Sequence, residues 1–515
     1  MAVVIEHDDP TPQKMRLAPL AVAMPSSKAL PGSEQPAELM NNAGDSQPHH
    51  PGTMLSRRRF LGGAATAAAF TILPRHVLGG AGHVSPNSKL TLAAIGTGGQ
   101  GLQNVQAFLE FPEVQIVAVC DVNREGPGYI SWNWDKGNAR NVAGREPARR
   151  LVEERYAKDR QASTYRGCKA YADYRELLAR EDVDAVMIAT PDHTHAVIAM
   201  AALKRRKHVY CEKPLAYSVY ETRQLTEAAR QAGVATQLGN QGQATAEARA
   251  TCEMIWSGAI GAVRDVHVSI GPRFWAPPLF DGRPTDTMPV PPDLDWDLWL
   301  GPAPDRPYHA AYCPWNWRNW WEFGTGLFGD MGCHRLSTVF KALKLGHPTS
   351  IEASSTKHGG EVYPDGVIAH FEFPARGDLP PVTLHWYDGG LKPARPRDLE
   401  PGRGIGDTIY VGAKGTLMGY RLIPEAKMKE LGRPPQKLPP SPGHYKEFVD
   451  ACHGGPSTGS NFVDHSGLLS EACVLGNVAL RSGKKLAWDG PGFKVTNDSA
   501  ANRLLHREYR AGWSL

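Results

Sequence analysis

The stretch from Leu90 to Asp121 constrains the fold of this chain more than any other. It begins with an apolar run, passes through three glycines with the spacing G-x-G-x-x-G (Gly96, Gly98 and Gly101), and continues as a helical apolar pattern. A second apolar run ends at Asp121, which follows Gly101 by 20 residues. This order of strand, glycine turn, helix, strand and acidic residue is that of a dinucleotide-binding βαβ unit.

Each part of this stretch has a physical role in holding a dinucleotide. Gly96 makes the tight turn, Gly98 lets the backbone approach a pyrophosphate, and Gly101 lets helix and strand pack closely. The helix start offers N–H groups and a positive dipole end to the phosphates. Asp121 accepts hydrogen bonds from ribose hydroxyls and repels a 2′-phosphate, which favours NAD over NADP, although Arg124 lies close enough to weaken this preference. The predicted cofactor-binding residues here are Gly96, Thr97, Gly98, Gly99, Gln100, Gly101 and Asp121.

The composition excludes several other classes of protein. The 515 residues are enough for two domains with full cores, and the net charge is only +4. No basic block resembles a nucleic-acid-binding arm, so no nucleic acid partner is expected. The eight cysteines form no C-x-x-C pair, and no carboxylate cluster has the spacing of metal ligands, so we predict neither a metal site nor a redox motif.

The first 82 residues are predicted to lie outside the folded domains. Residues 1–53 are rich in Pro, Ala, Ser and Asn without periodicity, which indicates a disordered or untranslated extension. Residues 54–82 carry the run SRRRFL at 56–61 and then small apolar residues, which fits a twin-arginine export signal. The apolar part is too short for a good membrane span. We therefore expect the twin-arginine machinery to export the chain to the periplasm or beyond; the alternative is a chance basic cluster before a buried helix.

Three further strand-like runs end in polar residues. Residues 184–189, 209–211 and 234–239 are short and apolar, as expected for buried parallel strands. The carboxyl ends of such strands line the cofactor crevice of a doubly wound sheet. The polar residues that follow them are therefore predicted to bind the cofactor: Thr190, Pro191, His193, His195, Glu212, Lys213, Asn240 and Gln241.

The motifs GTGGQG (96–101), ATPDHTH (189–195) and EKP (212–214) together resemble the Gfo/Idh/MocA oxidoreductases, named for glucose–fructose oxidoreductase and inositol dehydrogenase. The resemblance is strong over 89–261 and looser beyond. It implies an α/β fold: an N-terminal Rossmann domain with a doubly wound parallel sheet, then a C-terminal α/β domain with an open, mostly antiparallel sheet. It also implies that Lys213 approaches the nicotinamide and substrate, and that the second sheet forms a homo-oligomer, either a dimer or a tetramer.

The histidines of the second motif are interpreted through the same resemblance. It suggests that at least His195 lies near the nicotinamide end, so we assign His193 and His195 to the cofactor side and not to a metal. The alternative is that these histidines only cap the helix or pack their rings against neighbouring residues.

A glycine-rich segment of the second domain holds a second pair of candidates. Asp330 and His334 are four residues apart and share one face of a predicted helix. They resemble the family's D-x-x-x-H element, which faces the nicotinamide from the second domain. Histidine suits acid/base work, and Asp330 could orient the imidazole. The predicted catalytic residues are therefore Lys213, His334 and Asp330; the alternative is that Asp330 caps the helix and His334 lies in the core.

The region 272–321 is rich in proline and tryptophan. Its tryptophans are Trp275, Trp296, Trp299, Trp315, Trp317, Trp320 and Trp321. Such rings can stack on the C–H faces of sugars and line a carbohydrate site. They can equally pack the segment onto its own core or a subunit neighbour, and the sequence leaves both interpretations open.

The predicted organisation follows from these motifs. The Rossmann domain covers 88–215 and is completed by a helix and strand to about 242. A substrate and oligomerisation domain covers 243–490, and 491–515 is expected to be a surface tail. Residues 123–146, rich in glycine and asparagine, are expected to form an inserted loop.

The predicted function is that of an exported NAD-dependent oxidoreductase acting on a sugar, cyclitol or glycoside. His334 takes a hydroxyl proton and Lys213 stabilises the alkoxide while hydride is transferred. Because little free NAD is present outside the cytoplasm, we expect the cofactor to be held tightly and regenerated in place. One alternative is an NAD-dependent glycoside hydrolase or lyase that works by transient oxidation. Another is a non-catalytic sugar-binding protein with a vestigial cofactor site.

Overall fold

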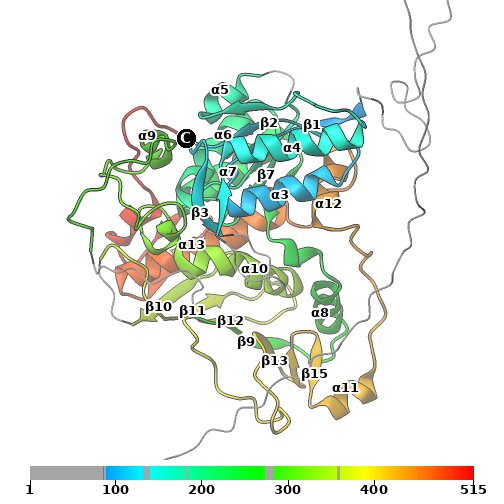
Figure 1. The fold of residues 1–515 in the computed structure, drawn as a ribbon. Coiled ribbons are helices and arrows are strands. Elements are labelled where there is room, and N and C mark those ends of the chain that lie inside the picture. Colours follow the sequence, from blue (N-terminus) through cyan, green and yellow to red (C-terminus); the bar gives the residue numbers. More distant parts are fainter. Residues whose placement is uncertain (1–84, 86–87, 131–139, 181–182, 273–281, 357–359) are drawn as a thin grey trace, which may run out of the picture. The chain divides into compact units, whose positions relative to one another are not determined.

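The structure is a computed structural model that describes residues 85, 88–130, 140–180, 183–272, 282–356 and 360–515 (Figure 1). The predicted extension, the predicted export signal and Trp275 lie outside the described residues. Within the described part of the chain, no helix combines the length and the apolar character needed to cross a membrane.

The first sheet has six strands in the order β5-β2-β1-β6-β7-β8, and every neighbouring pair is parallel. Its strands are β1 Leu90–Ile95, β2 Val114–Cys120, β5 Lys169–Tyr171, β6 Ala185–Ile188, β7 His208–Glu212 and β8 Thr236–Gly239. The connecting helices are α3 Gly99–Leu109, α4 Arg145–Asp159, α5 Tyr174–Leu178, α6 Asp192–Lys204 and α7 Val219–Ala232. Because β1 pairs with both β2 and β6, the strand order reverses there, which creates a crevice at the strand ends.

The second sheet has nine strands in the order β15-β14-β13-β9-β12-β11-β10-β16-β17. Its strands are β9 Val263–Ser269, β10 Ser350–Ser355, β11 Val367–Phe373, β12 Val382–Tyr387, β13 Thr408–Gly412, β14 Thr416–Met418, β15 Arg421–Ile423, β16 Leu486–Asp489 and β17 Lys494–Val495. The pair β9–β12 is parallel and the other described pairs are antiparallel. This confirms the predicted fold class of a parallel Rossmann sheet followed by an open, mostly antiparallel sheet.

The remaining helices surround or connect these two sheets. They are η2 Gln241–Ala244, α8 Ala246–Trp256, α9 Trp296–Leu300, η3 Asn316–Asn319, α10 Gly326–Leu343, α11 Glu425–Leu431, α12 His444–Cys452, η4 Phe462–Ser466, α13 Gly467–Ser482 and η5 Ala501–Leu505. Helices α10 and α13 pack against each other, and Phe328 of α10 stacks on Trp386 of β12 with ring centroids 5.2 Å apart. This packing fixes α10, which carries Asp330 and His334, against the sheet.

The segment predicted as a loop over 123–146 contains regular structure, which corrects that prediction. Strands β3 Gly126–Ile130 and β4 Arg140–Ala143 form a two-stranded antiparallel sheet. The β3 strand lies directly on the glycine loop, because a Cβ added to Gly99 would stand 1.9 Å from the Ile130 carbonyl oxygen. The sequence pattern missed it because a tertiary contact, and not local periodicity, holds these strands in place.

Most of the C-terminal residues 491–515 are exposed or half-buried, and a few buried side chains anchor this segment to the core. Val495, Ala501 and Leu505 are 4%, 1% and 1% exposed, and they belong to the main hydrophobic core. Strand β17 pairs with β16, and Trp513 packs against the same core. The polar composition of this stretch concealed a few apolar side chains that supply its anchors.

Candidate active site

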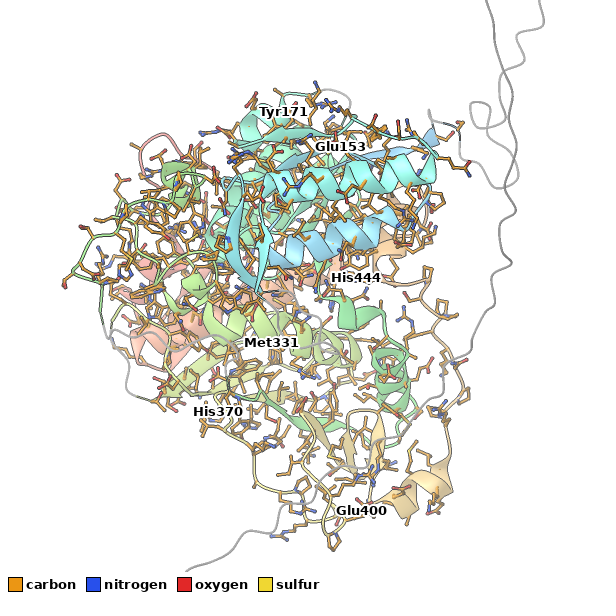
Figure 2. The ribbon with its side chains drawn as sticks, viewed as in Figure 1. Glu153, Tyr171, Met331, His370, Glu400 and His444 are labelled. Atoms are coloured by element: carbon orange, nitrogen blue, oxygen red, sulfur yellow. The ribbon has the colours of Figure 1, made fainter. Side chains whose placement is uncertain are left out.

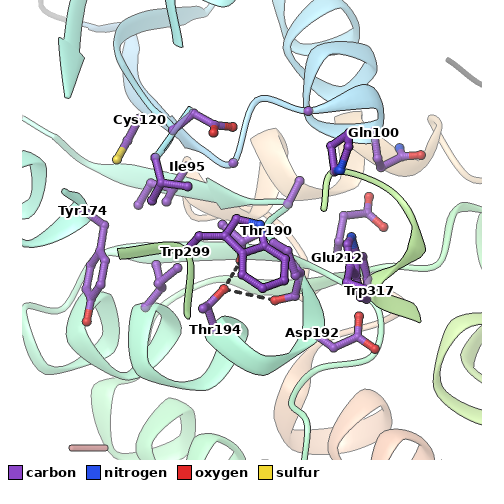
Figure 3. Close-up of a pocket in the computed structure, with 18 of the residues that line it drawn as sticks. Ile95, Gln100, Cys120, Tyr174, Thr190, Asp192, Thr194, Glu212, Trp299 and Trp317 are labelled. Atoms are coloured by element: carbon purple, nitrogen blue, oxygen red, sulfur yellow. Dashed lines mark hydrogen bonds between the residues drawn. The ribbon is translucent and has the colours of Figure 1, made fainter. Parts of the chain in front are cut away.

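A cavity that opens to solvent lies at the carboxyl ends of the Rossmann strands. Figure 3 shows it between Gln100, Thr190 and Glu212 of the first domain and Trp299 and Trp317 of the second. The predicted site residues that line it are Gly96, Gly98, Gly99, Gln100, Asp121, Thr190, Pro191, Glu212 and Lys213. The predicted residues that do not line it are Thr97, Gly101, His193, His195, Asn240, Gln241, Asp330 and His334.

The glycine loop has the form that a dinucleotide diphosphate requires. Gly96 has a φ of +83°, and a Cβ on Gly101 would lie 1.9 Å from the Gly96 carbonyl oxygen. Helix α3 begins after Gly98 with no side-chain cap, so its first N–H groups are left for a ligand. These groups and the helix dipole fit the phosphates of NAD. Gly101 therefore acts through close packing and does not line the cavity.

Asp121 ties the end of β2 to this loop. Its carboxylate accepts hydrogen bonds from the backbone N–H groups of Thr97 (2.7 Å) and Asn123 (2.8 Å). Burial raises the pKa of Asp121, and these hydrogen bonds oppose that rise. Arg124 pairs with Asp293 at 2.8 Å, so its charge is engaged elsewhere. An acidic residue at this position favours NAD, and the neighbouring Arg145 donates to the carbonyl oxygen of Asp121 at 3.0 Å.

His193 and His195 hold the framework and do not reach the cavity, which corrects their predicted cofactor contact. Both rings are almost fully buried. His193 Nε2 lies 2.9 Å from the carbonyl oxygen of Trp299, and His195 nitrogens lie 2.7 and 2.9 Å from the carbonyl oxygens of Pro214 and Thr190. Burial lowers the pKa of His193 to about 3. The two rings thus fix the start of α6 to the E-K-P turn and to the second domain.

Glu212 is supported by a buried polar network that includes Gln241. Glu212 Oε1 accepts hydrogen bonds from Gln241 Nε2 (3.2 Å) and from the Tyr210 hydroxyl (3.3 Å). The same hydroxyl lies 3.2 Å from Nε2 of His444, at the start of α12 (Figure 2). Asn240 donates to a backbone carbonyl of α10, so it joins the two domains. Gln241 and Asn240 therefore act behind the cavity wall and not on its surface.

Lys213 and Asp330 bring the two domains together at the cavity wall. Lys213 Nζ donates to Asp330 Oδ1 at 2.7 Å, and Arg318 Nε lies 3.7 Å from the same oxygen. Burial acts to raise the pKa of Asp330, but the charges of Lys213 and Arg318 outweigh it and lower that pKa. Burial acts to lower the pKa of Lys213, yet Asp330 and Glu212 raise it overall. The pair is therefore ionic.

Asp330 was predicted to orient His334, and the structure assigns it a different partner. Its described polar contacts are with Lys213 and Arg318. His334 lies one turn further along α10, where burial and the Lys213 charge lower its pKa to about 3. The imidazole is therefore neutral at neutral pH, and with so low a pKa it is a weak proton acceptor.

This low pKa predicts an unusual pH profile. An imidazole with a pKa of about 3 stays neutral from pH 5 to 8, so His334 should impose no acid limb near pH 6.5. Activity should fall through His334 protonation only as the pH approaches its pKa. A profile of kcat/KM against pH in the wild type and in His334→Asn tests this. An acid limb near pH 6.5 that the variant removes would contradict it.

The tryptophans of this region serve both interpretations, because Trp299, Trp315 and Trp317 line the cavity while several of the rings are also packed in the second domain. The described rings that are at most 7% exposed are Trp299, Trp317, Trp320 and Trp321. Trp296 and Trp299 stack with ring centroids 4.7 Å apart. Trp315 and Trp317 line the cavity, but their faces hold the guanidinium of Arg318, at 4.2 and 4.1 Å from the two ring centroids.

Sequence reasoning missed several residues that line the cavity. Asp192 accepts the backbone N–H (3.0 Å) and hydroxyl (2.5 Å) of Thr325, and burial raises its pKa to about 6. Its place inside the TPDHTH motif was an available signal. Arg318 stood out as a charge within the aromatic run WNWRNWW. No sequence pattern indicated Tyr129 or Trp513, because both reach the cavity from segments that are predicted to be a loop and a surface tail.

Comparison with known proteins agrees with this architecture. The model of the Gfo/Idh/MocA oxidoreductase family, NAD-binding Rossmann fold, matches residues 136–240, and that of its C-terminal alpha/beta domain matches 245–361. Inositol 2-dehydrogenase of Rubrobacter xylanophilus is 36% identical over 178 residues, 34% of this chain and 42% of its own length. Glycosyl hydrolase family 109 protein 1 of Shewanella sp. strain ANA-3 is 30% identical over 170 residues, 32% of each chain.

A solved structure shares the fold. The WlbA dehydrogenase from Chromobacterium violaceum, in complex with NADH and UDP-GlcNAcA, has a TM-score of 0.51 and 14% identity, with 79% of this chain and 97% of that one covered. The curated relatives are matched over only a fifth to about half of their own length. The two family matches follow one another along the chain, so residues 136–240 and 245–361 are similar to the NAD-binding Rossmann domain and the C-terminal domain of the Gfo/Idh/MocA oxidoreductases.

Proposed function

We propose that this chain is an exported NAD-dependent oxidoreductase that oxidises a hydroxyl group of a sugar, cyclitol or glycoside. The observation that carries the proposal is the contact between Lys213 and Asp330, one from each domain, at the wall of the cavity that starts at the glycine loop. A charged lysine at that position suits the stabilisation of an alkoxide.

Each residue of the site has a separate role in the proposed oxidation of the hydroxyl group. Bound NAD would supply the hydride acceptor, with its diphosphate on the start of α3 and its ribose toward Asp121. Lys213 stabilises the negative charge that develops on the substrate oxygen, and Asp330 holds the ammonium group in place. We assign uptake of the hydroxyl proton to His334 from its place in the D-x-x-x-H element, one turn along α10 from Asp330, although its side chain does not line the cavity.

The relatives support a polyol substrate. Inositol 2-dehydrogenase, by its name, acts on a cyclitol, which supports oxidation of a ring hydroxyl here. The glycosyl hydrolase relative supports a second candidate, in which transient oxidation enables glycoside cleavage. The two candidates use the same first step and differ in whether NADH accumulates.

The proposal has two further parts: the cofactor stays bound to the protein, and the protein is exported. The SRRRFL run supports export through the twin-arginine route, which carries folded proteins. Tyr129 and Trp513 line the cavity from segments outside the Rossmann sheet, and we propose that they cover the bound cofactor and so slow its release. We also expect a homo-oligomer, which light scattering of the purified protein would measure.

Purified protein should release NAD when it is denatured, as detected by mass spectrometry. Addition of inositols, aldoses or glycosides should change the absorbance of the bound cofactor. Cleavage of a glycoside without accumulation of NADH would favour the second candidate. Sugar binding without any change in the cofactor would contradict both candidates and establish a binding protein.

The export signal is tested separately. Residues 1–82 fused to a reporter should direct export of the reporter, and replacement of Arg57 and Arg58 by Lys should abolish that export.

A further inference from the structure

Arg318 is the cation of the cavity whose hydrogen-bonding capacity is least used. It lies in η3, lines the cavity beside Lys213, and has a side chain that is only 10% exposed. A guanidinium group carries five N–H donors. Within the described residues, the hydrogen bond that its side chain donates goes to the Trp315 carbonyl oxygen at 3.4 Å. Its Nε is buried and finds no hydrogen-bond partner in the part of the chain that the structure describes, since Asp330 at 3.7 Å is too distant.

The surroundings of Arg318 hold it in one orientation. Its guanidinium lies between the rings of Trp315 and Trp317, with its carbon 4.2 and 4.1 Å from their centroids. This sandwich restricts the plane of the guanidinium and shields it from water. A planar, dry and fixed arginine is suited to paired hydrogen bonds with a carboxylate.

Several neighbouring charged groups are already engaged, while Glu212 Oε2 and Asp330 Oδ2, which can only accept hydrogen bonds, have no hydrogen-bond partner among the described residues. Lys213 donates to Asp330 at 2.7 Å. Asp192 accepts two hydrogen bonds from Thr325, and one oxygen of Glu212 accepts those of its polar network. Arg318 is therefore the group with donors available to a bound molecule.

The position of Arg318 indicates which molecule it meets. It lies beside the Lys213–Asp330 pair, at the strand end of the E-K-P turn. The diphosphate site is at the start of α3, where the glycine loop supplies its own N–H groups. Because the proposed chemistry takes place at Lys213, a group that reaches Arg318 belongs to the substrate and not to the diphosphate.

We propose that Arg318 recognises a carboxylate on the substrate, so that the substrate is an acidic sugar: a uronic acid or a glycoside of one. This inference rests on the proposed function for the identity of the reaction, and on the cavity alone for the recognition of the carboxylate. The substrate's carboxylate bonds to the guanidinium, and the hydroxyl to be oxidised faces Lys213.

The test compares acids with neutral molecules of nearly the same shape. D-glucuronate, D-galacturonate and D-mannuronate are each paired with their methyl esters, and binding is followed by tryptophan fluorescence with NAD present. In the wild type we expect at least one acid to bind ten-fold or more tightly than its ester. Arg318→Met should remove this preference and leave the affinity for NAD unchanged. Arg318→Lys, which keeps the charge but loses the planar fork, should retain only part of it.

The controls separate this inference from the proposed function. Arg403→Met changes an exposed arginine that pairs with Glu425, and it should leave the acid preference intact. Equal binding of every acid and its ester in the wild type would overturn the inference, as would a preference that persists in Arg318→Met. Weaker NAD binding in that variant would also overturn it, because Arg318 would then serve the cofactor. Acid-selective binding without any oxidation would refute the proposed function and leave carboxylate recognition standing.

Discussion

Replacement of Lys213 by Met is expected to lower kcat by about 10²- to 10³-fold while NAD stays bound. Loss of one preorganised charge at a developing oxyanion has an effect of this size. The Lys213 ammonium donates to Asp330 at 2.7 Å and lines the cavity, so its removal takes away the charge that would face the substrate oxygen. Turnover of a sugar that the wild type oxidises, together with the NAD content of the purified variant, measures this.

The control for Lys213→Met must separate catalysis from folding. Removal of Lys213 leaves Asp330 buried with Arg318 at 3.7 Å as its remaining cation, which itself destabilises the fold. The double variant Lys213→Met/Asp330→Asn removes that buried charge and should recover stability without recovering turnover. Lys392→Met changes an exposed lysine and should alter neither property. Turnover in Lys213→Met equal to that of the wild type would refute the assignment.

Replacement of Gly101 by Ala is expected to weaken NAD binding by at least about 100-fold, or about 2.8 kcal/mol. The added Cβ would stand 1.9 Å from the Gly96 carbonyl oxygen. Gly96 is itself closely packed, because a Cβ added there would lie 2.6 Å from backbone atoms of Ala189 and Thr190. The loop must therefore move away from the start of α3, and we expect a loss of about 2 kcal/mol in unfolding free energy as well.

Titration with NAD and urea denaturation measure the two effects of Gly101→Ala. Gly346→Ala is a matched control, because an added Cβ there meets nothing within 4 Å and its φ is not positive. It should change the unfolding free energy by no more than about 0.5 kcal/mol. Wild-type affinity for NAD in Gly101→Ala would show that the glycine loop tolerates a shift and does not set the cofactor site.

The cofactor half of the site was largely predictable from the sequence because its parts are local. Strand, glycine turn, helix and second strand follow one another between Leu90 and Asp121, and periodicity with a 20-residue spacing identifies them. The strands at 367–373, 382–387 and 408–412 also agree with their apolar alternation. In such segments the same few neighbouring residues decide both the local structure and the face that is buried.

The contacts between distant segments could not be predicted in this way. Histidines such as His193 and His195 are common in catalytic sites, yet here both rings form hydrogen bonds with backbone carbonyl oxygens. Asp330 has the spacing to orient His334, but Lys213, 117 residues away in sequence, holds it instead.

The sequence by itself determined the order of the two domains, the glycine loop and the residues at the strand ends, because short-range periodicity encodes each of them. Only the tertiary structure decided that β3, the C-terminal segment and Arg318 meet at one cavity. The physical reason is that burial and charge pairing depend on which side chains come together in space. A linear pattern shows that a residue is polar or apolar, but not which partner will satisfy it.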